Sequence, residues 1–223
     1  HTNMLTVNGQ KMSKSLNNSF LPNELFSGSH ELLEQAYSPM TVRFFMLQSH
    51  YSSTLDFSNS ALQAAQKGYK KLINGLRILK AMEYENDGAD LNNEQIDQAN
   101  QIIVNLEAAM NDDFNTAKAI AQLFNLLKKI NGIYVGQLKY SEFGQDAFNK
   151  IKVTFIEFVE NVLGLEEEKI NTQGSLLETL IQLYKEAKFK KDYDKVDEIR
   201  AALKANGVIL KDMKDKVDWA YEE

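Results

Sequence analysis

The sequence predicts a mainly α-helical protein in three parts, and three observations support this prediction. Residues 58–165 place apolar side chains at alternating spacings of three and four residues, which is the period of amphipathic helices. Residues 166–174 are polar and acidic and end in glycine, as is typical of a linker. Residues 175–223 show the helical spacing twice more, followed by two short apolar runs, which favour a small α+β unit. Residues 1–57 are then a separate N-terminal segment.

The N-terminal segment starts with an apolar run, Met4 to Val7, which predicts a short strand that ends at a glycine turn. A strand at the start of a chain has no earlier partner, so we infer that part of a sheet is missing. The chain also begins with His1 rather than Met. We therefore expect a fragment of a longer protein.

The rest of this segment is predicted to hold two short helices. One spans His30–Tyr37. The other is capped by Ser38, has Pro39 at its first position and runs to Gln48. We expect residues 51–57 to form an irregular connector.

Four helices are predicted in the second part. Ser58 or Asn59 is a suitable N-cap for the first, which we expect to end near Met82. Capping residues 112–115 separate the second helix from the third, residues 136–144 form a loop, and Gly164 ends the fourth helix. The stripes that a bundle would bury are Leu62, Ala65, Tyr69, Leu72, Leu76 and Leu79; Ile96, Ala99, Ile103, Leu106 and Met110; Ala117, Ile120, Phe124, Leu127, Ile130 and Tyr134; and Phe148, Ile151, Phe155, Phe158 and Val162.

The third part is predicted to be two helices and two strands. The helices cover residues 177–187 and 193–203, with a turn between them, and Gly207 follows the second. Residues 208–210 form a strand whose expected partner is 217–219. These elements contain few apolar residues and can form only a small core. The unit would therefore be only marginally stable alone.

Composition excludes several classes of function. A net charge of −6 argues against indiscriminate binding of nucleic acids, and no apolar run is long enough to span a membrane. The absence of cysteine excludes disulfides, thiolate zinc ligands and cysteine nucleophiles within this sequence. The three histidines, His1, His30 and His50, lack the spacing of a metal site, so we expect no metal here.

Charged residues are segregated along the chain. Residues 83–113 hold nine acidic and no basic residues, whereas residues 67–80 hold five basic and no acidic ones. Such segregation is typical of a protein that presents one face to a polyanion, and equally of ordinary solvated helix faces. The basic side chains that fall mostly opposite the apolar stripe of the first long helix are Lys67, Lys70, Lys71 and Arg77.

Catalytic chemistry is easiest to place in the run Lys11-Met12-Ser13-Lys14-Ser15. Two ammonium groups beside hydroxyl side chains suit a phosphate-binding loop, because positioned lysines stabilise charge on phosphate oxygens. The same string is also typical of an exposed turn.

These five residues match the signature loop of class I aminoacyl-tRNA synthetases, and four further motifs narrow the resemblance. The chain resembles the C-terminal half of cysteinyl-tRNA synthetase from residue 1 nearly to its end. One departure follows the loop, where the family commonly has Leu-Gly-Asn and this chain has Leu16-Asn17-Asn18. Asn tolerates a positive φ, so we expect the turn to be preserved. The further motifs are Thr6-Val7-Asn8-Gly9-Gln10; Arg43-Phe44-Phe45 with Ser49-His50-Tyr51; Leu55-Asp56-Phe57-Ser58; and Asp112-Asp113-Phe114-Asn115-Thr116.

The resemblance implies that residues 1–57 are the lysine loop and stem-contact remnant of a catalytic domain. Lys14, with Lys11, would clamp ATP during formation of cysteinyl-adenylate, and Met12, Ser13 and Ser15 would complete the loop. The Rossmann-type domain that binds cysteine, and the zinc ion that reads its thiol, would lie outside this sequence. The parent would be a cytoplasmic, monomeric ligase that uses ATP, cysteine and tRNA(Cys), and this fragment would be inactive alone.

The resemblance also implies that residues 175–223 read the tRNA anticodon, because Lys188, Tyr193, Asp197 and Asp212 match positions that face its bases. Carboxylates accept hydrogen bonds from base amino groups, and aromatic rings stack on unpaired bases. Lys188 replaces an Arg of many members and cannot form a two-pronged contact with guanine. Trp219 matches a terminal tryptophan of the family.

Three of these residues also have a purely structural interpretation. Tyr193 suits the core of its own helix as well as it suits base stacking. Asp197 is also typical of a solvated helix position, and Asp212 of a turn.

Under the same resemblance, the basic face formed by Lys67, Lys70, Lys71 and Arg77 would contact the tRNA backbone. Two other functions stay open. One is a relative that adenylates cysteine and transfers it to a small amine, although such a protein needs no anticodon unit. The other is a helical interaction module that binds no particular tRNA.

Overall fold

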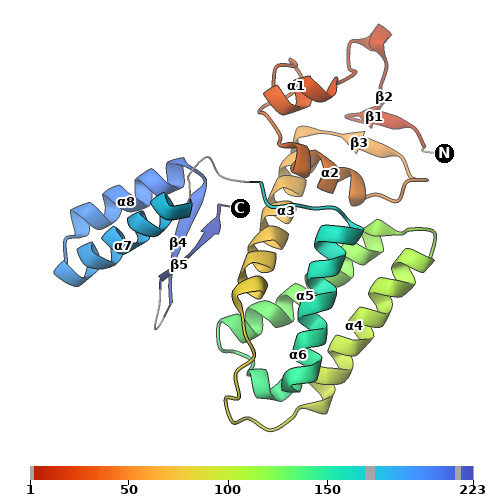
Figure 1. The fold of residues 1–223 in the computed structure, drawn as a ribbon. Coiled ribbons are helices and arrows are strands. Elements are labelled where there is room, and N and C mark those ends of the chain that lie inside the picture. Colours follow the sequence, from red (N-terminus) through yellow and green to blue (C-terminus); the bar gives the residue numbers. More distant parts are fainter. Residues whose placement is uncertain (1–2, 169–173, 214–216, 223) are drawn as a thin grey trace. The chain divides into compact units, whose positions relative to one another are not determined.

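The computed structural model describes residues 3–168, 174–213 and 217–222 and divides into two compact units, residues 1–166 and 167–223 (Figure 1). Most of the predicted linker, 166–174, lies outside the described residues. None of the helices in the described ranges is long and apolar enough to cross a membrane.

The lysine loop extends from a three-stranded sheet in the first unit, with the strand order β2-β1-β3. β1 (Leu5–Val7) and β2 (Gln10–Lys11) are antiparallel and are joined by Asn8 and Gly9, both of which have the positive φ that a two-residue hairpin requires. β3 (Leu55–Phe57) lies parallel to β1. The predicted first strand is confirmed.

The prediction of an irregular connector over residues 51–57 is wrong at its end, because residues 55–57 form β3. Three residues carry too little pattern to predict a strand. Pairing with β1, fifty residues earlier in the chain, makes this segment extended.

The predicted helix over His30–Tyr37 is also wrong. Asn59 binds the backbone of this segment from outside: its amide nitrogen donates to the Leu32 carbonyl at 2.8 Å and its oxygen accepts from the Glu34 N–H at 3.0 Å. These are backbone groups that a helix over this segment would have to pair within itself.

A short helix, α1 (Pro22–Ser27), lies earlier than the predicted one, with Pro22 in its first turn and Gly28 in the left-handed conformation at its end. The sequence does contain a pattern that indicates this helix, a proline at its start and a glycine just after its end. The next helix is confirmed: α2 (Pro39–Leu47) starts at Ser38, whose hydroxyl accepts from the Thr41 N–H.

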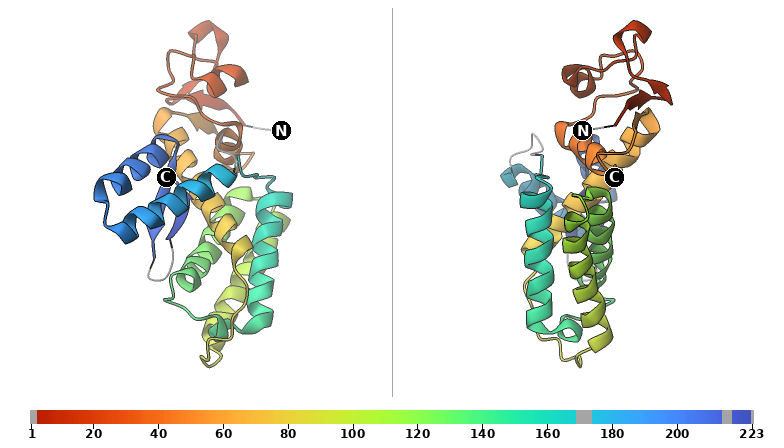
Figure 2. Two further views of the ribbon diagram at one scale, coloured as in Figure 1. Left: turned by 60° about the vertical axis from the view of Figure 1, so that its left-hand side comes forward. Right: turned by 90° about the vertical axis from the view of Figure 1, so that its right-hand side faces the viewer.

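The predicted four-helix bundle is confirmed, and Figure 2 shows its helices side by side. α3 (Asn59–Ala81) and α4 (Asn93–Asn111) are followed by α5 (Thr116–Tyr134) and α6 (Tyr140–Glu157), and a π-helical turn, Phe158–Val162, continues α6. Most residues of the predicted stripes are buried, among them Leu62, Leu72, Leu79, Leu106, Phe148 and Phe155. The prediction is wrong for Val162, which is exposed after α6 gives way to the π-helical turn. On α5 the buried face is shifted from the predicted one: Leu123 is fully buried, whereas Ala117, Phe124 and Tyr134 are only half-buried.

Gly75 is buried where α3 packs against Leu127 of α5. A Cβ added at Gly75 would lie 2.1 Å from Cδ1 of Leu127, so the Leu127 side chain fills the space that a side chain at residue 75 would need.

The loop predicted over residues 136–144 is too long, because α6 begins at Tyr140. Its first turn is capped from a distant loop, where the Asp87 carboxylate accepts from the N–H groups of Tyr140 at 2.9 Å and Ser141 at 3.2 Å. Gly144 departs from helical geometry with a φ of 69°, which explains why the sequence pattern begins only after it. Gly164 follows the π-helical turn with a φ of 59°, as expected for a helix end.

Two of the quoted motifs meet at one end of this bundle. The Tyr51 hydroxyl donates to the Asp113 carboxylate at 2.7 Å, and His50 stacks on Tyr51 with ring centroids 4.7 Å apart. Asp113 and Phe114 both have positive φ in the turn between α4 and α5. This contact joins the segment after α2 to the bundle.

The second unit has the predicted order of elements. α7 (Gly174–Lys190) and α8 (Tyr193–Ala205) precede β4 (Val208–Asp212) and β5 (Val217–Tyr221), which are antiparallel with Leu210 opposite Trp219. The buried core of this unit is formed by Leu177, Tyr184, Ala187, Val196, Ile199, Leu203 and Val208.

Candidate functional site

The lysine loop presents its two ammonium groups to solvent. Lys11 is exposed on β2, and Lys14 is exposed at the start of a short 3₁₀ helix, Lys14–Leu16. Neither side chain forms an ion pair within the described ranges, so both are available to an anion. Met12 and Ser13 are half-buried, and Ser15 is exposed.

Asn18 holds the two ends of this loop together. Its side chain is buried; its oxygen accepts from the Ser13 N–H at 2.8 Å and its nitrogen donates to the Lys11 carbonyl at 3.1 Å. The Ser13 hydroxyl accepts from the Leu16 N–H, and Asn17 takes a φ of 52°. The expectation that Asn replaces the family's glycine in a left-handed turn is confirmed.

Asp56 fixes the base of the lysine hairpin. One of its carboxylate oxygens accepts from the Thr6 hydroxyl at 2.6 Å and from the Gly9 N–H at 2.8 Å. Because Asp56 belongs to β3 and α3 begins at Asn59, the hairpin is anchored at the entrance to the bundle.

The basic face of α3 is less uniform than its sequence predicts. Lys67 and Lys71 are exposed one turn apart, Lys70 is half-buried, and Arg77 is also half-buried. Lys71 lines a cleft of about 490 Å³ together with Lys128 of α5, which is exposed as well. The sequence of either helix alone does not indicate that Lys128 belongs with Lys71. The two lysines line one cleft because α3 packs against α5.

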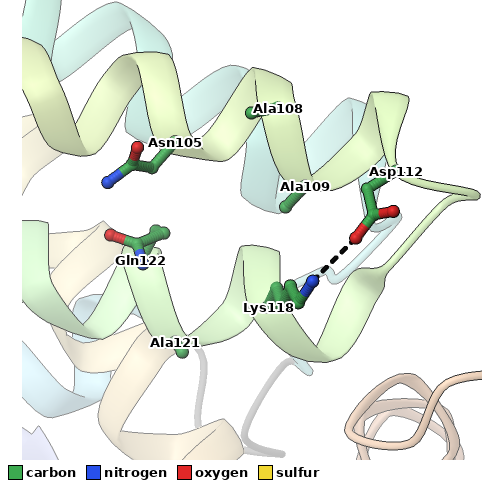
Figure 3. Close-up of a pocket in the computed structure, with 7 residues that line it drawn as sticks. All are labelled: Asn105, Ala108, Ala109, Asp112, Lys118, Ala121 and Gln122. Carbon is green, nitrogen blue, oxygen red and sulfur yellow. Dashed lines mark hydrogen bonds and ion pairs between the residues drawn. The ribbon is translucent and has the colours of Figure 1, made fainter.

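A second cleft, of about 380 Å³, lies between the end of α4 and the start of α5 (Figure 3). Its ammonium group, that of Lys118, lies 2.7 Å from the Asp112 carboxylate. Hydrogen bonding to Lys118 holds the pKa of Asp112 below its usual range. This cleft contains none of the predicted site residues.

In the second unit, three polar side chains surround Asp212 at the end of β4. Its carboxylate lies 2.9 Å from the Lys188 ammonium and 2.8 Å from the Arg200 guanidinium, and it accepts from the Tyr184 hydroxyl at 3.0 Å. Two cations around one carboxylate leave a local excess of positive charge. We refer to Lys188, Arg200, Tyr184 and Asp212 as the tip cluster.

The tip cluster favours the ionised form of its carboxyl group. Burial raises the pKa of Asp212, but hydrogen bonds from Lys188 and Tyr184 outweigh this effect and lower it below 3.8. The hydrogen bond with Asp212 raises the pKa of Lys188. Burial, together with the bond to Asp212, raises the pKa of Tyr184.

Of the predicted anticodon residues, Lys188 and Asp212 form an ion pair in the described part of the chain. Tyr193 is 66% exposed at the first position of α8, so its interpretation as a core residue is wrong. Asp197 is exposed one turn later on the same helix, and no described contact joins it to the tip cluster. Trp219 is half-buried in β5, where it packs against the core of the unit and lies edge-on to Tyr221.

Arg200 and Tyr184 are the members of the tip cluster that the sequence reasoning missed. Arg200 lies three residues after Asp197 and seven after Tyr193, so all three share one side of α8. That spacing was a usable signal. Tyr184 reads as a core residue because its ring is fully buried, and only the fold shows where its hydroxyl points.

The described residues contain no cluster of His, Asp and Glu that would hold a metal ion, and the sequence has no cysteine. The thiol-reading zinc ion that the family resemblance implies therefore has no suitable ligands among these residues.

Comparisons with known sequences show which class of protein this chain is similar to. Residues 1–67 match the family model of the class I (C) tRNA synthetase catalytic domain, and residues 105–182 match the DALR domain. The chain thus combines part of a class I tRNA synthetase catalytic domain with a DALR domain.

Three of the most similar relatives are cysteine–tRNA ligases. The chain is 52% identical to a cysteine–tRNA ligase of Cytophaga hutchinsonii over 100% of its own length and 45% of the relative's. It is 41% identical to the enzyme of Bacteroides thetaiotaomicron and 34% identical to that of Chlorobaculum tepidum, in each case over 44% of the relative. The chain is homologous to the C-terminal part of cysteine–tRNA ligases, and it spans less than half their length.

Proposed function

We propose that this chain is the tRNA-binding and ATP-clamping part of a cytoplasmic, monomeric cysteine–tRNA ligase. In this proposal Lys14 and Lys11 contact ATP, and the tip cluster with Tyr193 and Asp197 reads the anticodon of tRNA(Cys). The observation that carries the proposal is that similarity to these ligases runs through both sites, from the lysine loop to the end of the second unit.

The lysine loop suits one half of an adenylation site, the half that contacts the phosphates of ATP. Two exposed ammonium groups would stabilise the negative charge that spreads over the phosphates as pyrophosphate leaves. The Asn18 clasp and the Asp56 anchor would hold the loop in position for this contact. Residues that bind adenine, ribose and cysteine, and the zinc ion, would come from outside this chain. We therefore expect the chain alone to catalyse no ATP–pyrophosphate exchange.

The tip cluster supports base recognition. A carboxylate can accept from the amino and imino groups of guanine, and the neighbouring Lys188 and Arg200 can donate to base oxygens or phosphates. The exposed ring of Tyr193 offers a stacking surface. The excess positive charge around Asp212 favours an RNA ligand in a chain whose net charge is −6.

Lys71 and Lys128 support a second, sequence-independent contact in the first unit. Their exposed ammonium groups line one cleft and suit phosphate groups of an RNA backbone.

The test is fluorescence anisotropy of labelled tRNA with the cysteine anticodon GCA, beside a transcript changed only in the anticodon. We expect both to bind with a common salt dependence and the altered tRNA to bind at least about tenfold more weakly. Equal binding of both would contradict anticodon reading, whereas no binding at low salt would favour the small-amine ligase or the interaction module.

Three variants separate the two contacts. Lys71→Gln and Lys128→Gln should weaken the binding of both tRNAs equally. Each substitution should also lower the slope of log affinity against log salt concentration by about 1. Lys118→Gln removes the same charge from a side chain already paired with Asp112 (Figure 3), so it should change little. A loss of discrimination in the Lys71 variant would contradict the proposed division of tasks.

A further inference from the structure

Phe189 is the most exposed large apolar side chain among the described residues, with 90% of its surface accessible. It lies near the end of α7, whose buried side is formed by Leu177, Tyr184 and Ala187. Residue 189 is offset by about 200° from Ala187 around the helix, so its ring points away from the core of the unit. Core packing therefore does not explain why the position holds phenylalanine.

The surroundings of Phe189 are strongly basic. Lys188 and Lys190 flank it, Lys191 follows, and Lys185 lies four residues earlier on the same side of α7. Glu186, the acid in this stretch, is hydrogen-bonded to Gln182. An exposed aromatic ring among lysines suits single-stranded nucleic acid, in which every base has a face for stacking and the phosphates carry the negative charge.

Phe189 also lies next to the tip cluster without belonging to it. Its neighbour Lys188 turns toward Asp212, and Lys191, with a φ of 58°, ends the helix before α8 begins at Tyr193. A base held at Asp212 would therefore leave the adjacent nucleotide of the same loop within reach of the Phe189 ring.

We propose that Phe189 is an additional base-stacking residue, which binds an unpaired nucleotide next to the one that meets Asp212. This inference rests on the proposed function, because it requires the tip cluster to bind an RNA loop. It assigns a role to a side chain that neither the motifs nor the tip cluster includes.

The experiment uses the full 223-residue chain and the tRNA(Cys) anticodon stem-loop with 2-aminopurine placed at each loop position in turn. Stacking on an aromatic ring changes the fluorescence of this base analogue. We expect the wild type to give a stacking signal at two positions, and Phe189→Ala to lose one of them and to bind at least about fivefold more weakly. Phe189→Trp should keep both the affinity and the signal.

Phe189→Leu is the decisive variant, because leucine keeps the apolar bulk and lacks the π-face. Leucine should behave like alanine if the ring stacks; wild-type binding by the leucine variant would overturn the proposal. Leu183→Ala removes another exposed apolar side chain from α7 and should leave binding unchanged. Circular dichroism should show every variant folded, since residue 189 contributes almost nothing to the core.

The results also separate this inference from the proposed function. If the wild-type chain binds no stem-loop, both fail. If it binds and discriminates anticodons while Phe189→Ala matches it, only the role of Phe189 is overturned.

Discussion

The Lys188 ammonium lies 2.9 Å from the Asp212 carboxylate, so two residues proposed to face the anticodon are bonded to each other in the free chain. A base that hydrogen-bonds to Asp212 must share this carboxylate with Lys188 or displace it. The nearby Arg200 remains 2.8 Å from the second carboxylate oxygen and would keep the charge compensated in either case.

Lys188→Arg should sharpen discrimination at the anticodon position that the tip cluster reads. The guanidinium has a planar fork that can bond a guanine with two hydrogen bonds, whereas an ammonium group acts as a point charge. We expect the preference for the cysteine anticodon over a transcript changed at that guanine to rise by about tenfold. Anisotropy titrations of the two transcripts measure it, and Lys185→Arg serves as a control outside the cluster. Equal preference in the Lys188 variant and the wild type would contradict a direct contact with guanine.

The second unit should lose stability in acid through Asp212. Burial opposes ionisation of this carboxyl group, but hydrogen bonds from Lys188 and Tyr184 give it a folded-state pKa below 3.8. Its contribution is therefore fully present above the unfolded value and is lost as the pH falls from about 4 through the lowered pKa.

Trp219 is the only tryptophan and belongs to this unit, so its fluorescence reports thermal unfolding there. The difference in Tm between the wild type and Asp212→Asn should be constant from pH 7 to about pH 5 and should shrink below pH 4. A difference that is independent of pH would show that the tip cluster does not stabilise the unit through charge.

Asn18→Ala should loosen the lysine loop without unfolding the unit. The substitution removes the acceptor of the Ser13 N–H and the donor to the Lys11 carbonyl. Losing these two hydrogen bonds lowers the free energy needed to open the loop by about 1–3 kcal/mol. Exchange of the Ser13 amide hydrogen should therefore accelerate by at least about fivefold. Asn17→Gly is the matched control, because glycine accepts the left-handed conformation and leaves the clasp intact. Unchanged exchange at Ser13 in the alanine variant would mean that the clasp does not order the loop.

Gly75→Ala should destabilise the first unit by about 1–3 kcal/mol, although alanine is the better helix former by about 1 kcal/mol. The new Cβ would collide with the Leu127 side chain of α5. Denaturant unfolding measures the effect, and the double variant Gly75→Ala/Leu127→Ala tests its cause. The two changes should be less than additive, because removing Leu127 removes the collision. Simple additivity would contradict the close approach.

The elements that the sequence predicts well are those whose signals are local. The stripes of α3 to α6 repeat over several turns, and the Asn17 turn follows from the tolerance of one residue type for positive φ. The failures have distant causes. Asn59 keeps residues 32–34 out of a helix, Asp87 caps α6 from another loop, and β3 is extended because β1 lies beside it.

The candidate sites follow the same division. Lys11 and Lys14 are predictable because their neighbours in sequence define the loop. The tip cluster is not, because it collects Lys188 and Tyr184 from α7, Arg200 from α8 and Asp212 from β4. Periodicity indicates which of these side chains are buried, but it does not indicate that a buried tyrosine directs its hydroxyl to an acid 28 residues later.

The parallel pairing of β1 with β3 has a consequence for synthesis on the ribosome. β1 is translated before its partner, and fifty residues separate Thr6 from Asp56. At about 5–20 residues per second, β1 waits several seconds without its partner strand. An unpaired strand is a template for aggregation, and short length and lysine are the usual protection. β1 has only three residues, so the edge that it leaves unpaired during this interval is short.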